Sequence, residues 1–172
     1  MENQFIGYEY KDIIVEKSLE AIFIDSFTYF GWQLETSRPS LSTHQSVELK
    51  FKRDRKIRNK AELTRLQRQF EAFVHEISLL ETSKKTKAMI VAFTLGICGT
   101  VLIAASTFSY LGGLYLAMIL FAAPGFIGWI LPYFCYMKIY EKKVKEINPL
   151  IEKKYDEIYD ICEKANQLLG KG

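Results

Sequence analysis

The sequence predicts a mainly α membrane protein. We expect a two-helix transmembrane hairpin extended by a cytoplasmic antiparallel coiled-coil-like hairpin, with a small N-terminal β-α-β-β (α+β) module. Three observations predict this class. Residues 88–137 form a run of 50 without one Asp, Glu, Lys or Arg. Apolar residues recur at helical spacing on both sides of that run. Apolar and polar residues alternate near the N-terminus, as in half-buried strands.

The segment 1–56 is predicted to form the α+β module. Its expected elements are a strand over Phe5–Val15, a helix over Glu16–Tyr29 that Gly31 ends, a strand over Trp32–Thr36, a turn at Ser37–Ser40 and a strand containing Val47, Leu49 and Phe51. Three strands and one helix are marginally stable alone. We therefore expect the module to lean on the helical hairpin.

Three short motifs in this module carry a resemblance. They are Tyr8-Glu9-Tyr10-Lys11, Gly31-Trp32-Gln33-Leu34 and Leu49-Lys50-Phe51-Lys52-Arg53. Residues 5–54 resemble a short bacterial domain of unknown function whose pattern runs YEYK, GWEL, FKR, with Gln33 replacing its usual Glu. The whole chain resembles uncharacterised two-span membrane proteins of Gram-positive gut bacteria. The resemblance implies a bacterial plasma membrane and the α+β module, and it implies no activity.

Residues 57–87 are predicted to form an amphipathic heptad helix. Its apolar residues are spaced 3,4,3,4,3, which is typical of a coiled-coil seam; they are Leu63, Leu66, Phe70, Phe73, Ile77 and Leu80. Asn59 is the expected N-cap, and Glu62 completes a sequence like a capping box. No Gly or Pro follows before the uncharged run, so we expect this helix to continue into the first span.

The uncharged run has the length of two membrane spans, since a bilayer core needs about 20 apolar residues per helix. We predict transmembrane helices over 88–109 and 113–137, joined at Ser109–Gly113, where paired glycines favour a turn. Lysines flank both spans on the side away from this turn; they are Lys84, Lys85, Lys87, Lys138, Lys142, Lys143 and Lys145. By the positive-inside rule both termini are then cytoplasmic. No N-terminal signal peptide is expected, because Met1–Ser18 is charged.

Small residues recur every four positions in the first span, at Ala92, Gly96, Thr100 and Ala104. Such a stripe lets another helix approach closely. The simpler interpretation is packing against the second span of the same chain, and contact with another subunit is the alternative. In the second span Pro124, Gly128 and Pro132 also recur every four residues. A hinge or gate is one interpretation of these three residues, although prolines are common in membrane helices.

The segment 138–172 is predicted to be a cytoplasmic amphipathic helix with a looser apolar stripe. Its members are Val144, Ile147, Ile151, Ile158, Cys162, Ala165 and Leu169, with Tyr155 filling the central gap. We expect Asn148 to cap a new helix whose first residue is Pro149 and which Gly170 ends. Two assemblies would bury these stripes. In one, the stripe packs against the heptad helix of the same chain, and in the other the heptad helices of different subunits associate. Spacing alone leaves both open.

The strongest charge feature is a basic run near the end of the module. It contains Lys50, Lys52, Arg53, Arg55, Lys56, Arg58 and Lys60, against Asp54 alone. We consider it a candidate partner or anion patch, with a solvated strand edge and helix start as the simpler interpretation. An upright helix from residue 59 to 87 would hold this run about 40 Å from the first span, too far for lipid headgroups.

No residue set for catalysis is evident. The sequence holds no P-loop, dinucleotide fingerprint, zinc pattern or Ser/His/Asp set, so we expect no enzyme and no cofactor. The three cysteines lack CxxC spacing and indicate small apolar positions in a reducing compartment. An acidic patch on the last helix is expected to pair with basic residues of the facing helix; it comprises Asp156, Glu157, Asp160 and Glu163.

Composition narrows the function classes further. The chain has 172 residues with 23 Lys and Arg against 20 Asp and Glu, a net charge of +3. This near balance argues against a general nucleic-acid binder. Our first hypothesis is a membrane-anchored structural or interaction protein that displays the module to a cytoplasmic protein partner. The alternative is a homo-oligomeric small pore or channel component, which needs several subunits because two spans cannot enclose a path.

Overall fold

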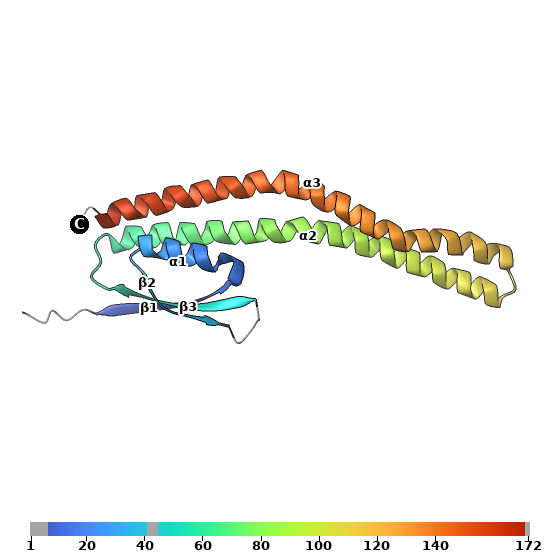
Figure 1. Cartoon of the computed structure of the whole chain (residues 1–172), viewed down its shortest axis with the longest axis horizontal. Coiled ribbons are helices and arrows are strands. Elements are labelled where there is room, and N and C mark those ends of the chain that lie inside the picture. Colours follow the sequence, from blue (N-terminus) through green and yellow to red (C-terminus); the bar gives the residue numbers. More distant parts are fainter. Residues whose placement is uncertain (1–6, 41–44, 171–172) are drawn as a thin grey trace, which may run out of the picture. The chain divides into compact units, whose positions relative to one another are not determined.

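The computed structural model describes residues 7–40 and 45–170 of the chain. The fold is mostly helical, with two long helices packed against each other and a small N-terminal three-stranded antiparallel sheet (Figure 1). The elements are β1 (Tyr8–Glu16), the 3₁₀ turn η1 (Lys17–Leu19), α1 (Glu20–Tyr29), β2 (Gln33–Pro39), β3 (Ser46–Asp54), α2 (Lys60–Leu111) and α3 (Tyr115–Gly170). The predicted β-α-β-β order is confirmed within the described residues.

The sheet has the order β1-β3-β2, with β3 paired antiparallel on both sides. Strand alternation divides β3 into two faces. Val47, Leu49, Phe51 and Arg53 are buried, whereas the residues between them are half-exposed. The predicted wet face with Lys50 and Lys52 is therefore present, and Arg53 lies on the opposite, buried face.

The second strand is longer than predicted. Ser37 and Pro39 were expected in a turn, but β2 continues to Pro39, which pairs with Val47. A proline is tolerated there because β2 is an edge strand and Pro39 is its last residue. The start of the first predicted strand, Phe5 and Ile6, lies outside the described residues. Residues 41–44 lie outside them as well.

The chain divides into two compact units. The first unit comprises residues 1–75 and 154–172, and the second comprises 76–153. In the first unit, phenylalanines from four elements form one aromatic core; they are Phe23, Phe27, Phe30, Phe51 and Phe70. Phe27 is fully buried, with its ring centroid 4.6 Å from that of Phe51 on β3 and 6.1 Å from that of Phe70 on α2. The module thus leans on α2, as expected.

Glycine at position 31 closes α1. Its φ of +82° lies in the left-handed region, which favours glycine at the end of a helix. A Cβ there would also lie 2.1 Å from Cδ1 of Ile57. The chain turns here so that Trp32, 5% exposed, enters the core directly before β2.

The start of α2 differs from the predicted cap. Asn59 does precede the helix, but its φ is +55° and its side chain donates to the Leu168 carbonyl at 3.4 Å. Glu62 pairs with Arg65 instead of completing a capping box. The backbone carbonyl of Asn59 accepts the first helical hydrogen bond, from Leu63. From Lys60 the helix is continuous to Leu111, as the absence of Gly and Pro before the uncharged run predicts.

Asn148 does not cap a new helix. α3 is one helix from Tyr115 to Gly170, with Pro124, Pro132 and Pro149 inside it. A proline inside a helix removes one hydrogen bond and crowds the preceding turn, yet neighbouring contacts can outweigh that cost. Buried Ile147 and Ile151 flank Pro149 at one turn's spacing and hold the helix on its packed side.

The predicted apolar stripes are largely buried, with departures on both helices. On α2, the unpredicted Val74 is 2% exposed, whereas Phe73 and Leu80 of the predicted seam are only half-buried. Leu63, Leu66, Phe70 and Ile77 of α2 are at most 3% exposed. On α3, Tyr155 was expected to fill the central gap but is 42% exposed. Lys154 fills it: its Nζ lies 4.3 Å from the centroid of the Phe73 ring. A lysine can do so because its aliphatic stem packs like an apolar side chain while its ammonium remains solvated.

In the second unit, glycines form the closest helix contact. A Cβ on Gly99 would lie 2.9 Å from the backbone carbon of Gly128, and a Cβ on Gly125 would lie 2.7 Å from Ile103. Small residues at such a contact allow two helix backbones to touch. The helices are joined at Gly112–Leu114, where Gly113 has a φ of +74°. This agrees with a glycine turn, although Ser109 and Tyr110 still belong to α2.

Candidate functional site

The motifs that carry the resemblance converge in the first unit. Glu9 and Lys11 point from β1 to the same side of the sheet as Arg53 on β3, because residues of like parity share a face. Trp32 joins them from the start of β2. Gln67 and Glu71 on α2 complete a polar network beside the aromatic core. We call these six residues the motif network.

Arg53 is the centre of the motif network. Its side chain is 4% exposed, its Nε donates to Oε1 of Glu9 at 2.6 Å, and its Nη1 donates to the Phe30 carbonyl at 3.2 Å. The guanidinium also lies 4.3 Å from the centroid of the Trp32 ring. A buried arginine with this many partners holds the module together. Arg53 is therefore not available to an external anion.

Glu9 serves two cations at once. Besides Arg53, it accepts a hydrogen bond from Nζ of Lys60 at 2.5 Å. Burial opposes the charged form of Glu9, but the hydrogen bonds from Lys60 and Arg53 prevail and lower the pKa of this carboxyl. Glu9 thus stays ionised and connects β1 to the start of α2.

A second branch of the motif network connects Trp32 to Lys11. Nε1 of Trp32 donates to Oε1 of Gln67 at 2.8 Å, and Nε2 of Gln67 donates to Oε1 of Glu71 at 2.8 Å. Nζ of Lys11 donates to the same Glu71 oxygen at 2.5 Å. The residues of this branch line a cleft of about 300 Å³, which Arg68 also lines. Its polar groups satisfy one another, which gives the cleft a structural role.

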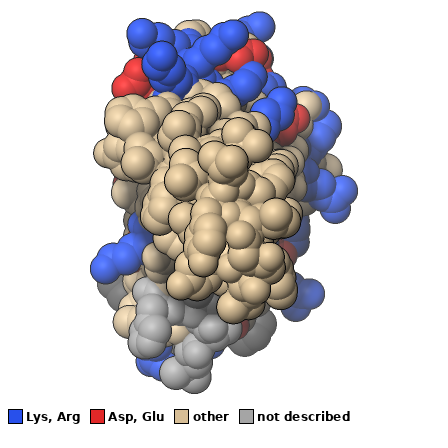
Figure 2. All heavy atoms as spheres, turned by 90° about the vertical axis from the view of Figure 1, so that its right-hand side faces the viewer, with Lys and Arg blue, Asp and Glu red and all other residues tan. Residues whose placement is uncertain are grey.

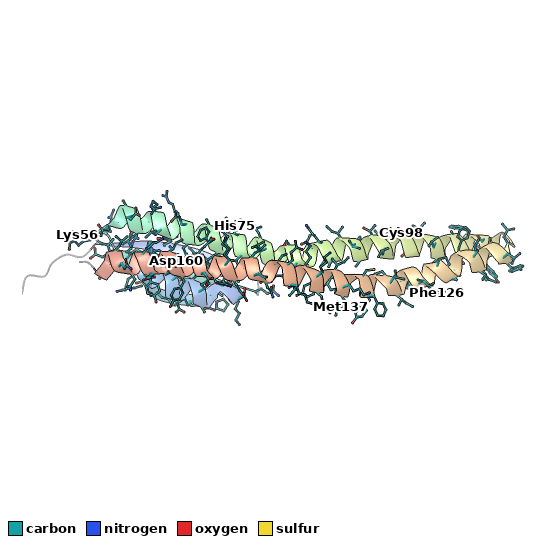
Figure 3. All side chains as sticks on the ribbon, turned by 90° about the horizontal axis from the view of Figure 1, so that it is seen from above. Lys56, His75, Cys98, Phe126, Met137 and Asp160 are labelled. Atoms are coloured by element: carbon teal, nitrogen blue, oxygen red, sulfur yellow. The ribbon has the colours of Figure 1, made fainter. Side chains whose placement is uncertain are left out.

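The predicted basic run divides into three environments. Arg53 and Lys60 hold Glu9, as above. Lys52 pairs with Glu35 at 3.1 Å, and Lys50 pairs with Asp12 at 3.4 Å and with Glu48 at 3.6 Å, both lysines on the wet face of the sheet. Arg55, Lys56 and Arg58 remain exposed in the loop before α2, and none of the three forms an ion pair with another described residue. Figure 3 shows Lys56 in this loop.

A short exposed surface of α2 also carries positive charge. Lys60, Thr64 and Arg68 follow one another at i, i+4 spacing along a shallow groove that Arg65 also lines. Arg65 is paired with Glu62, whereas Arg68 has no acidic partner among the described residues. We call Arg55, Lys56, Arg58 and Arg68 the basic edge. It combines the three exposed residues of the predicted patch with Arg68, which was not predicted, in a surface that an acidic partner can contact.

The outer face of the sheet is open. Tyr8, Tyr10 and Ile14 of β1 are 43%, 66% and 63% exposed. Nζ of Lys52 lies 5.6 Å from the centroid of the Tyr8 ring. Two of the motif residues, Tyr8 and Tyr10, thus lie on the exposed face, whereas Glu9 and Lys11 of the same motif lie on the other side of β1 and are half-buried. The alternation of residues along the strand from Val47 to Arg53 is the sequence signal that distinguishes the buried face of the sheet from the exposed face.

The predicted small-residue stripe is not the glycine contact of the hairpin. Gly99 makes that contact, while a Cβ on Gly96 would meet nothing within 4 Å. Ala92, Gly96 and Thr100 instead line a shallow groove at the side of the hairpin, partly bounded by Trp129. Nε1 of Trp129 donates to Oγ1 of Thr100 at 3.3 Å, and Ala104 is exposed. Packing of the stripe against the second span therefore holds for Thr100 and not for Gly96, and a subunit contact stays a prediction.

The three residues predicted as a hinge lie in continuous helix. Gly128 packs on Gly99, so its lack of a side chain has a packing reason. Pro124 is exposed and Pro132 is half-exposed beside the groove of the small-residue stripe. Bending at these positions stays a prediction.

The remaining candidate residues occupy ordinary structural places. Among residues 7–40 and 45–170, no group of three or more His, Cys, Asp or Glu is arranged to hold a metal ion. All three cysteines are free thiols; burial raises the pKa of Cys162, partly offset by a hydrogen bond with Ser26. In the acidic patch, Glu157 pairs with Lys154 of its own helix, so pairing across to the facing helix is wrong for this residue. Glu163 accepts from Gln167, also on α3.

Comparisons with protein-family models, curated proteins and solved structures find no match for this chain.

Proposed function

We propose that the chain is a membrane-anchored structural or interaction protein that displays a small cytoplasmic α+β module. One observation carries this proposal. α2 and α3 are each long and apolar enough to cross a bilayer, yet only 11% and 6% of their most apolar 18-residue windows are buried within the protein. A core helix of a soluble protein has the same composition but is mostly buried. Lipid is the solvent that suits apolar helices with exposed side chains.

The distribution of charge supports the same proposal. Figure 2 faces the end that carries the Gly112–Leu114 turn, and the surface of that end is free of Lys, Arg, Asp and Glu. Figure 3 shows Cys98 and Phe126 on the outer sides of α2 and α3, consistent with their exposure. The nearest lysines flank the uncharged run, before residue 88 and after residue 137. This pattern favours two spans of a bacterial plasma membrane with both termini in the cytoplasm.

Membrane extraction tests the anchor. We would express the full chain, isolate membranes and wash them with alkaline carbonate. The test variant carries Ile97→Asp, Val101→Asp, Ile127→Asp and Ile130→Asp, all at side chains at least 51% exposed. Each Asp near a span centre costs about 2.5–3.5 kcal/mol of insertion free energy. We expect the wild type in the washed pellet and the variant outside it.

A control places two Asp residues on the module instead of in the spans. Tyr10→Asp and Ile14→Asp alter side chains of similar exposure on the outer face of the sheet. We expect this variant to remain in the washed membranes. If the four-Asp chain also stays in the pellet, or if the wild type washes off, the anchor is contradicted.

The module is proposed to contact a cytoplasmic protein partner through the basic edge. Arg55, Lys56, Arg58 and Arg68 are exposed and lack acidic partners within the described residues, so an acidic surface can pair with them without first breaking internal ion pairs. The network around Arg53 supplies a rigid base. Nucleic acid is disfavoured as the partner by the small net charge of +3.

A homo-oligomeric pore or channel component is the alternative proposal. The observation that favours self-association is the groove along Ala92, Gly96 and Thr100, which the chain's own second helix leaves open. Most Ser and Thr hydroxyls in the apolar part of α2 donate hydrogen bonds to backbone carbonyls of the same helix, as Thr100 does to the carbonyl of Gly96. The mass of the solubilised chain, measured by light scattering, distinguishes the pore from the anchor. A monomer excludes the pore, and a defined ring of subunits supports it.

A further inference from the structure

We propose that five lysines of the second unit form a collar that binds the headgroups of anionic phospholipids. They are Lys85 and Lys87 on α2 with Lys138, Lys142 and Lys145 on α3. The inference rests on the proposed membrane anchor and names a lipid partner for it. We call these five residues the lysine collar.

The lysine collar lies directly at the edge of the uncharged run. Lys87 is the last charged residue before the run, and Lys138 is the first after it. A cationic side chain at this position is within reach of lipid phosphates, because lysine stems extend along apolar surface to the headgroup level. The basic edge of the module lacks this adjacency in sequence.

The collar lysines are exposed and free of ion pairs. Two neighbouring lysines are used internally: Lys84, 6% exposed, donates to Glu81 at 2.8 Å, and Lys143 donates to Glu146 at 2.6 Å. Within the described residues, no such acidic partner is found for the five collar lysines. Glu146, which pairs with Lys143, is within electrostatic reach of Lys87 and Lys142 but forms no ion pair with either of them.

The two helices present these lysines together. Lys138, Lys142 and Lys145 follow i, i+4, i+7 spacing and share one side of α3. Gly99 of α2 packs on Gly128 of α3 in this antiparallel hairpin, so Lys87, twelve residues before Gly99, lies at about the level of Tyr140, twelve residues after Gly128. Lys87 of α2 also helps to lower the pKa of Glu146 on α3, together with the Lys143 hydrogen bond, so the two lysine groups are within electrostatic reach of each other.

Aromatic side chains mark the same level. The rings of Tyr136 and Tyr140 stack with centroids 5.9 Å apart and planes 3° from parallel, one on each side of Lys138 along the chain. Tyrosines with an apolar ring and a polar hydroxyl favour the headgroup region. Charge complementarity then selects the occupant, because an anionic headgroup near the surface gains about 1 kcal/mol per lysine.

Quenching of tryptophan by brominated lipids tests the collar in the full chain. Trp129 lies nine residues before Lys138, about 13 Å along the helix, so acyl chains of a collar-bound lipid can reach it. We would reconstitute the chain in mixtures of phosphatidylglycerol and phosphatidylcholine, with bromine on one lipid and then on the other. The Trp129→Phe chain supplies the background from Trp32.

The expected result is an about tenfold preference of the wild type for phosphatidylglycerol at low salt, which falls as salt is added. The variant with all five collar lysines changed to Gln should show a ratio near one. The control with Arg55→Gln, Lys56→Gln and Arg58→Gln should keep the wild-type preference, because these side chains belong to the basic edge.

Three outcomes would overturn the collar, and they differ in what else fails. Equal quenching by both lipids in the wild type removes the collar and leaves the membrane anchor standing. Quenching by neither lipid removes the anchor as well. Loss of the preference in inorganic phosphate, but not in chloride of equal ionic strength, would show a site for free phosphate instead of a lipid headgroup.

Discussion

The two units treat apolar side chains in opposite ways. In the first, five phenylalanines from α1, the following turn, β3 and α2 meet in one closed core, and the polar groups beside it satisfy one another. In the second, large apolar side chains such as Phe93, Leu116 and Phe126 are 60% to 88% exposed. These phenylalanine side chains are thus buried in the first unit and exposed in the second. The difference supports our proposal that the two units suit different solvents, water for the first and lipid for the second.

The largest effect should come from an identical change made in each unit. Phe27→Ala removes a fully buried ring, and we expect it to destabilise the module by about 3–5 kcal/mol because the aromatic core cannot collapse onto the space. Phe126→Ala, at a side chain 60% exposed, should change the stability of the module by less than about 0.5 kcal/mol.

Trp32 reports this comparison. The chain has two tryptophans, so a Trp129→Phe background leaves Trp32 in the module core as the single emitter. Unfolding of the full chain in mild detergent is followed by Trp32 fluorescence against denaturant. Equal losses for Phe27→Ala and Phe126→Ala would show that the two units are not packed in contrasting ways.

The next effect concerns the motif network. Glu9→Gln removes the charge opposite Arg53, whose side chain is 4% exposed, and leaves a buried guanidinium without its counter-ion. We expect a loss of about 2–3 kcal/mol in the unfolding free energy of the module, measured with the same Trp32 signal. The matched change Glu62→Gln breaks only the exposed pair with Arg65 and should cost about 0.5 kcal/mol or less. A Glu9→Gln chain as stable as the Glu62→Gln chain would contradict the central place of Arg53.

The glycine contact sharpens the comparison inside the second unit. Gly99→Leu should force α2 and α3 apart, since even a Cβ there lies 2.9 Å from the Gly128 backbone. The matched change Gly96→Leu should leave the helix contact intact, because a Cβ on Gly96 meets no atom within 4 Å. We expect Gly99→Leu to lower the free energy of opening the hairpin by about 1–3 kcal/mol, seen as faster amide hydrogen exchange over 95–106 and 118–130. Similar exchange in both variants would argue against this glycine contact.

The smallest effect is a pH dependence. The pKa of Glu9 is lowered in the folded chain from 4.5, so its carboxylate contributes stability above the unfolded pKa and loses it as pH falls through the folded pKa. The stability difference between wild type and Glu9→Gln should be constant above about pH 5 and shrink below it. Unfolding curves from pH 3 to pH 7 measure this, and a difference that grows toward low pH would contradict the pairing.

The sequence predicted the elements more fully than the contacts between them. The 3₁₀ turn η1 and the full length of β2 were not predicted. Periodicity located the remaining strands and the helical regions of the described residues, because a period of two or of 3.6 is a local property. It missed the continuity of α3 across Pro149, since tertiary contacts of Ile147 and Ile151 override the local preference. It also placed Tyr155 where the stem of Lys154 packs, because a seam rule treats lysine as polar along its whole length.

The candidate site was harder to predict than the fold. Arg53 counted as one more cation in a basic run, although its position two residues after Phe51 in the alternation could have assigned it to the buried face. Gly96 belongs to the small-residue stripe of the first span, whereas Gly99 has Leu95 and Ile103 as its neighbours at four-residue spacing. Which of them touches α3 depends on where Gly125 and Gly128 fall across the turn, and the spacing within one helix does not contain that information.

Oriented cysteine labelling tests the central claim most directly. In a background with Cys98, Cys135 and Cys162 replaced by Ala, single cysteines are introduced as Leu114→Cys in the hairpin turn or Lys56→Cys in the module loop. Intact cells are treated with a membrane-impermeant maleimide. A chain anchored as we propose is labelled at position 114 from outside and at position 56 only after the membrane is opened. Labelling of both positions from outside, or of neither until the membrane is opened, would contradict a two-span anchor that displays a cytoplasmic module.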